Sequence, residues 1–112
     1  MSNLFRITSN HGFHITFENG VTVSVQFGYG NYCANRNNLN LLDHPYELVE
    51  SENAEVAIWD AQSDWVRYPG EYDDVISNVS PAKLIEILNF AQSMLSSPIG
   101  SLSRGDRASL RR

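Results

Sequence analysis

Two runs of alternating apolar and polar residues, joined by a short turn sequence, constrain the fold of this chain most strongly. Phe13, Ile15 and Phe17 alternate with polar residues, and the pattern resumes over residues 21–27. A period of two places apolar side chains on one face of a strand and polar ones on the other. The link Glu18-Asn19-Gly20 is typical of a type I turn followed by a left-handed glycine. We therefore predict a β-hairpin with one buried face and one face in water.

Three further segments are predicted to form strands around this hairpin. Phe5 and Ile7 indicate a short strand before it. The run AEVAIWD at residues 54–60 is rich in small, β-branched and aromatic residues, which indicates a strand buried on both faces in the interior of the sheet. Residues 65–68 are expected to return as the next strand and to end at Pro69-Gly70. Trp59 is expected to fill the core.

A helix is predicted after residue 80. Ser80 is a good N-cap, and Pro81 suits the first helical position, where its missing N–H costs nothing. An apolar stripe at helical spacing should pack on the sheet, and it comprises Leu84, Ile87, Leu88, Ala91 and Leu95. The helix is expected to fade near Ser96. The predicted fold class is α+β, a small antiparallel sheet of about 4–5 strands with one C-terminal helix packed on one face.

Length and composition indicate one domain followed by a tail. The chain has 112 residues, which fits a single domain. We assign residues 1–95 to one α+β domain. Residues 96–112 are rich in serine, glycine and arginine and have little to bury, so we predict a flexible basic tail.

The acidic charge of the chain bears on its partners. The formal net charge is −5, and acidic residues are dense from residue 43 to residue 74. An acidic body repels phosphate backbones, so we expect no direct nucleic-acid binding by this domain. Such a charge suits a basic protein partner, and solubility alone is the simpler explanation.

Cysteine usage and the N-terminal sequence indicate a compartment. Cys33 is the single cysteine, so no intramolecular disulfide can form, which favours a reducing environment. The N-terminus has no basic start followed by an apolar run, so we expect no signal peptide. No stretch approaches the ~18 apolar residues of a membrane span. We therefore expect a cytoplasmic protein without a membrane segment.

Residues 28–53 are expected to form a long loop and to hold the functional site. The segment is rich in glycine and asparagine, which tolerate left-handed backbone, and long loops in small domains are usually functional or mobile. Aromatic residues with a polar group are enriched where one protein grips another. The predicted binding residues are Tyr29, Asn31, Tyr32, Asn35 and Arg36. The sheet face that the helix leaves uncovered is the other candidate.

The residues favour simple binding over three kinds of chemistry. Cys33 with a histidine could act as a thiol nucleophile, but nothing near it in sequence would lower its pKa. His11-x-x-His14 with Cys33 matches no standard zinc spacing, so no metal or other cofactor is predicted. Gly28-Tyr29-Gly30 follows a strand but completes no phosphate-binding motif. Arg36 and nearby asparagines leave a small anionic ligand open.

The string GFHITFENGVTVSVQFGYGNYCANR at residues 12–36, with AEVAIWD further on, resembles a family of short proteins encoded by tailed phages and prophages. The matching pieces are Asn19-Gly20, residues 23–26, residues 30–33, Asn35-Arg36, Glu50-Ser51, residues 54–57 and Trp59-Asp60. Phe27 stands where the family's tryptophan is expected. The resemblance covers most of residues 12–95 but not the tail. It implies a non-structural phage protein that works in a bacterial cytoplasm, and it carries no assigned activity.

Three hypotheses of function follow. The first is a non-enzymatic, phage-type binding protein that engages a host protein, because small acidic phage proteins often redirect or block host machinery, including defence systems. The second is a small-ligand protein that sequesters a nucleotide around residues 28–36. The third, ranked last, is an enzyme built on Cys33. A homodimer through an exposed sheet face or edge strand stays open.

Overall fold

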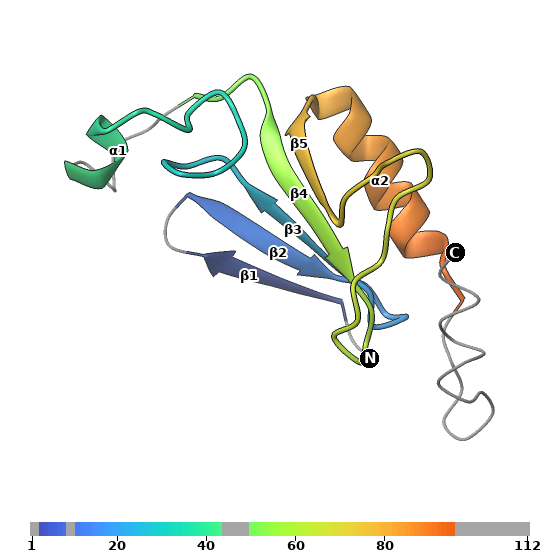
Figure 1. Cartoon of the computed structure of the whole chain (residues 1–112). Helices are drawn as coiled ribbons and strands as arrows, with labels where there is room; N and C mark the ends of the chain where they lie inside the picture. The colour runs from blue at the N-terminus through green and yellow to red at the C-terminus, as the bar shows by residue number, and fades with distance from the viewer. Residues whose placement is uncertain (1–2, 9–10, 44–49, 96–112) are drawn as a thin grey trace.

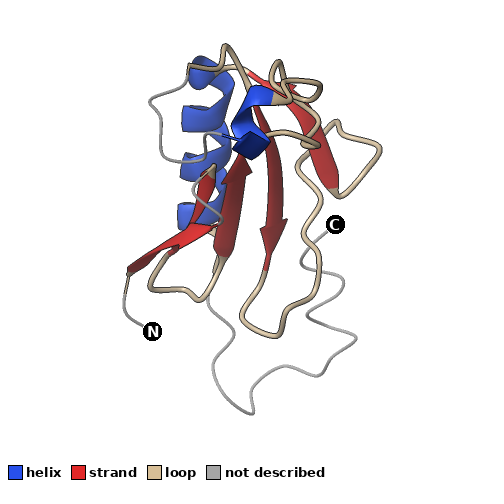
Figure 2. Cartoon of the chain, turned by 90° about the vertical axis from the view of Figure 1, so that its left-hand side faces the viewer, coloured by secondary structure: helices blue, strands red, loops and turns tan. Residues whose placement is uncertain are grey.

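Five antiparallel strands and one long helix make up the described part of the chain, residues 3–8, 11–43 and 50–95 of a computed structural model. The strands lie side by side in chain order (Figure 1), and they are β1 (Leu4–Thr8), β2 (Gly12–Thr16), β3 (Thr22–Gln26), β4 (Ala54–Trp59) and β5 (Val75–Val79). A short helix, α1 (Asn40–Asp43), lies between β3 and β4 in the sequence. The long helix, α2 (Pro81–Ser93), packs on one side of the sheet (Figure 2). The predicted α+β fold is confirmed.

The predicted hairpin forms β2 and β3. Phe13 lies opposite Val25 and Ile15 opposite Val23, so the apolar positions of both strands share one face. Gly20 has a φ of 85°, the left-handed conformation that the turn requires of this position. The strand predicted around Phe5 also forms, as β1.

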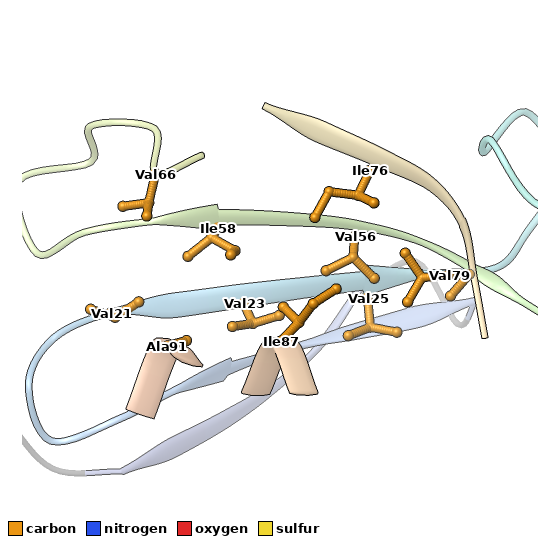
Figure 3. Packing of buried hydrophobic residues seen from close by; sticks show 11 residues of the cluster. Val21, Val23, Val25, Val56, Ile58, Val66, Ile76, Val79, Ile87 and Ala91 are labelled. Atoms are coloured by element: carbon orange, nitrogen blue, oxygen red, sulfur yellow. The ribbon is translucent and has the colours of Figure 1, made fainter. Parts of the chain in front are cut away.

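The core lies between α2 and the middle of the sheet. Val23, Val25, Val56 and Ile58 are almost fully buried on β3 and β4. Ile87 of α2 points at this group (Figure 3) and is itself fully buried. Burying each such aliphatic side chain contributes about 1.5–3 kcal/mol. Because β4 has a strand on each side, the predicted interior position of this strand is confirmed, but the strand ends at Trp59, and Glu55 and Trp59 are only half-buried.

Both ends of α2 are capped by side chains. Ser80 acts as the predicted N-cap, since its hydroxyl accepts a hydrogen bond from the Lys83 amide at 3.2 Å. At the other end the Asn19 amide donates to the carbonyls of Ala91 at 2.8 Å and Met94 at 2.9 Å. The helix ends at Ser93, earlier than predicted, and Leu95 is exposed rather than part of the buried stripe.

The prediction of a strand at residues 65–68 is wrong. Trp65 makes one isolated bridge to Trp59, after which Val66 turns into the core. Pro69 has no N–H for a ladder, and Gly70 adopts a φ of 90° that turns the chain away. The strand that pairs with β4 is instead β5, which sequence analysis did not identify. A bulge and the positive φ of Asn78 (52°) break the alternation in β5 that would have revealed it.

The segment predicted as a long loop is partly organised. Residues 28–38 form consecutive turns, and α1 follows, with Leu41 buried while Leu39 and Leu42 are exposed. Residues 44–49 of this segment lie outside the described residues, as does the predicted tail at residues 96–112.

Candidate functional site

The face of the sheet opposite α2 gathers aromatic and polar side chains. His14 of β2 lies opposite Ser24, and Trp59 of β4 lies opposite Thr22. Ile58, the neighbour of Trp59, points into the core under α2, and successive strand residues alternate. His14 and Trp59 therefore lie on the face that α2 leaves uncovered, which we call the open face. The expectation that Trp59 fills the core is wrong, because Ile58 takes the core position.

Three rings cross the open face in edge-to-face contact, and we call them the aromatic row: His14, Trp59 and Trp65. The ring centroids of His14 and Trp59 are 5.0 Å apart with an interplanar angle of 85°. Those of Trp59 and Trp65 are 5.9 Å apart at 87°. Each such pair contributes about 0.5–1.5 kcal/mol beyond area burial. Strand pairing through β3 positions His14 and Trp59, and the isolated bridge between Trp59 and Trp65 positions Trp65. Trp65 is 51% exposed.

Beyond Trp65, the open face continues into a hollow of about 580 Å³ with acidic walls. It is lined by Tyr32, Trp65, Asp73, Asp74, Val75 and Ser77. Tyr32 is 47% exposed, so the hollow has two accessible rings. Arg67 lies 3.5 Å from one carboxylate oxygen of Asp74 and offsets part of the negative charge. The hollow thus offers ring faces and carboxylates to a ligand from solvent.

A second hollow, of about 500 Å³, lies at the other end of the aromatic row. Its lining includes Leu4, Arg6, His14, Thr16 and Trp59. Burial lowers the pKa of His14 below its ordinary value of 6.5, and the nearby Arg6 guanidinium lowers it further. The lowered pKa favours the uncharged form of His14, and Arg6 is the cation in the lining of this hollow. The open face thus has a hollow of mixed charge at β1, where Arg6 and Asp60 both line it, and an acidic hollow at β5.

Two of the five predicted binding residues, Asn31 and Asn35, make hydrogen bonds that hold the loop together. Asn35 is buried, and its amide donates to the carbonyls of Phe27 and Glu50. The Asn31 oxygen accepts from the Gly28 amide at 3.0 Å, and its amide donates to Glu55 at 3.2 Å. The asparagines are therefore explained by turn construction.

The other three predicted residues are exposed. Tyr29 and Tyr32 present their rings to solvent, and the Arg36 guanidinium lies 4.3 Å from the centre of the Tyr32 ring. Glu55 of β4 positions this turn, because its carboxylate accepts from the Tyr32 amide at 2.8 Å. The structure thereby places Tyr32 beside Trp65 at the edge of the open face, whereas no contact between Tyr29 and the aromatic row is found among the described residues.

Most backbone amides between residues 28 and 36, which a phosphate cradle would need, donate hydrogen bonds within the chain. The Gly30 amide donates to the carbonyl of Arg36, the Cys33 amide to that of Asn31, and the Ala34 amide to the Asn53 side chain. The Gly28 amide is held by Asn31, as described above. An anion at this turn would have to replace these bonds.

The remaining reactive side chains show packing roles. Cys33 is buried, and its thiol lies 3.8 Å from the Gly28 carbonyl. His11 packs on Gly28, where an added Cβ would lie 2.6 Å from the His11 Cβ. Within residues 3–8, 11–43 and 50–95, no group of three or more histidine, cysteine or acidic side chains is arranged to hold a metal ion.

Sequence reasoning overlooked the aromatic row. Its three members come from separate segments of the chain, and only the strand register joins them. The sequence nevertheless indicated part of the row, since the alternation in β2 predicts that His14 lies on the face opposite the buried residues. For Trp59, counting the alternation from the core position of Ile58 would have given the same answer.

No protein-family model, no curated protein and no solved structure matches this chain. None of the helices in the described ranges is long and apolar enough to cross a membrane.

Proposed function

We propose that this chain is a non-enzymatic protein-binding module that grips its partner with the open face. The observation that carries the proposal is the aromatic row, which ends at the exposed Trp65 beside Tyr32. Tryptophan and tyrosine supply large contact area at low cost in side-chain entropy and are enriched at interface hot spots. A rigid sheet holds these rings in place before binding, which lowers the entropy lost in the complex.

The charges favour a partner with a basic patch. The chain carries a net charge of −5, and the hollow beside Trp65 is lined by Asp73 and Asp74. Opposite charges accelerate encounter and fix the orientation of the complex more than they raise its affinity. The resemblance to phage proteins adds the proposal that the partner is a protein of the bacterial host.

The test is affinity capture from a bacterial lysate, with the captured protein identified by mass spectrometry and its affinity then measured with purified components. Trp65→Ala and Tyr32→Ala should each weaken binding about tenfold or more, as expected for hot-spot residues. Ile85→Ala is the matched control, because Ile85 is 61% exposed on α2, away from the open face. It should bind like the unmodified chain.

Two outcomes would contradict the proposal. Equal loss of binding in the Ile85 control would place the interface elsewhere. If no partner is captured by the folded protein, a thermal-shift screen of nucleotides at millimolar concentration tests the small-ligand alternative, because a ligand of the native state raises stability.

A further inference from the structure

Among the described residues, strand β1 is an outer strand of the sheet with no strand on its far side, and its surface is apolar and exposed. Phe5 is 73% exposed and Ile7 is 80% exposed, and both lie on the same side of the sheet as α2, opposite Ile15 and Phe13. In Figure 1, β1 forms the outer edge of the sheet, away from α2. Sheet edges of soluble proteins are normally protected by charge, proline or a covering segment, because they pair readily with another strand. Arg6, which points to the open face, is the one charge in β1.

The register identifies the backbone groups that β1 leaves unpaired. The amides of Phe17 and Phe27 donate to Val21 and His11, so the odd-numbered residues of β2 bond to β3. Antiparallel strands alternate the direction of these groups, so the even-numbered residues of β2 bond to β1. Leu4, Arg6 and Thr8 are their partners in β1. The N–H and C=O groups of Phe5 and Ile7 therefore point outward from the edge.

We infer that β1 pairs antiparallel with β1 of a second copy of this chain, which forms a two-fold symmetric dimer with a continuous ten-stranded sheet. A strand edge is complemented only by another extended strand, and antiparallel pairing of identical strands satisfies the same groups on both copies. The pairing also brings Phe5 and Ile7 of both copies together on one face.

The charge distribution favours a second copy at this edge over any other part of the surface. The net charge of −5 makes two copies repel each other, but Glu18 is the one acidic residue that precedes Asp43 in the sequence. Of the described acids, Asp73 and Asp74 line the hollow at β5, the far edge of the sheet from β1, whereas Asp60 lines the same hollow as the cation Arg6. Joining through β1 keeps the acidic regions of the two copies apart, where salt screens them.

Charge repulsion argues against the register that is centred on Arg6, and we infer the register that is centred on Phe5. Centring the pair on Arg6 would place two guanidinium groups directly opposite each other, which destabilises a cross-strand pair. Centring it on Phe5 places Phe5 opposite its symmetry mate as a hydrogen-bonded pair. Leu4 then faces Arg6 of the second copy as a non-hydrogen-bonded pair, with Cα atoms about 4.5 Å apart.

The experiment is sedimentation of the full chain over a hundredfold range of concentration, with folding checked by circular dichroism. The unmodified chain should shift from monomer to dimer. Ile7→Pro removes an outward N–H that the sheet of one copy does not use, and Phe5→Lys adds charge at the two-fold axis, so both should stay monomeric. Ile85→Lys introduces the same charge at a similarly exposed apolar residue of α2 and should still dimerise.

Cross-linking tests the register separately. A mixture of Leu4→Cys and Arg6→Cys chains should form a disulfide-linked pair on mild oxidation, whereas Leu4→Cys alone should not, since its two copies lie too far apart. A chain that stays monomeric at every concentration, or a dimer that survives both Ile7→Pro and Phe5→Lys, would overturn the inference. If Ile7→Pro does not fold, Phe5→Lys and the cross-link decide. None of these readouts depends on the proposed partner.

Discussion

The amide of Asn19 ties the turn between β2 and β3 to the C-terminal end of α2, and replacing Asn19 with aspartate should destabilise the fold. The side chain donates to Ala91 at 2.8 Å, to Met94 at 2.9 Å and more weakly to Gln92 at 3.3 Å. A neutral hydrogen bond contributes about 0.5–1.5 kcal/mol net, so losing the two short bonds should lower the free energy of unfolding by about 1–3 kcal/mol.

The aspartate also adds an unfavourable charge. Its carboxylate would face carbonyl oxygens at the negative end of the helix dipole, which costs about 0.3–1 kcal/mol more. Asn19→Asp keeps the side-chain size and the oxygen that accepts from the Val21 amide at 3.0 Å, so the change isolates the lost donor. Part of the loss should return at low pH, because a protonated carboxyl can donate again.

Urea unfolding followed by tryptophan fluorescence measures the effect, with an unchanged dependence on urea as the sign that the unfolded state is unaffected. Gln92→Glu is the control, because it adds the same charge to the last turn of α2 at an exposed side chain without removing the Asn19 donor. The free energy of unfolding of Gln92→Glu should decrease by no more than the helix-dipole contribution of about 0.3–1 kcal/mol. If Asn19→Asp were as stable as the unmodified chain at neutral pH, the inferred tie between hairpin and helix would be wrong.

Two further predictions concern the open face. The pKa of His14 is lowered in the folded state, so the unfolded state binds the proton at a higher pH than the folded state does. The free energy of unfolding should therefore be unaffected by His14 above pH 6.5 and should decrease as the pH falls through the folded pKa. NMR titration of the unmodified chain should give a His14 pKa below 6.5. In Arg6→Gln the pKa should rise but stay below 6.5, because burial is the larger cause. A His14 pKa of 6.5 in the unmodified chain would refute the assignment. Glu55→Gln should destabilise the 28–36 turn by about 1–2 kcal/mol, because it weakens the hydrogen bond to the Tyr32 amide. Hydrogen exchange at that amide should accelerate. Unchanged exchange would mean that Glu55 does not position Tyr32.

Several elements were predictable because their causes are local. The alternation of residues 13–27 with the Asn19-Gly20 turn determined the hairpin, and Ser80-Pro81 with the following apolar stripe determined the start and buried face of α2. Backbone conformation at a turn or a helix N-cap depends mainly on neighbouring residues. The fold class follows from these elements, since one apolar sheet face and one amphipathic helix bury each other.

The tertiary structure decided what depends on partners distant in the chain. Residues 75–79 became a strand, and residues 65–68 did not, because pairing with β4 overrides a weak local preference. Distant partners also distinguish the predicted site residues. The amides of Asn31 and Asn35 donate to groups distant in the chain, whereas Glu55 accepts a hydrogen bond from Tyr32 and so positions it at the open face. The aromatic row exists only through strand register, which joins three residues that no local pattern connects.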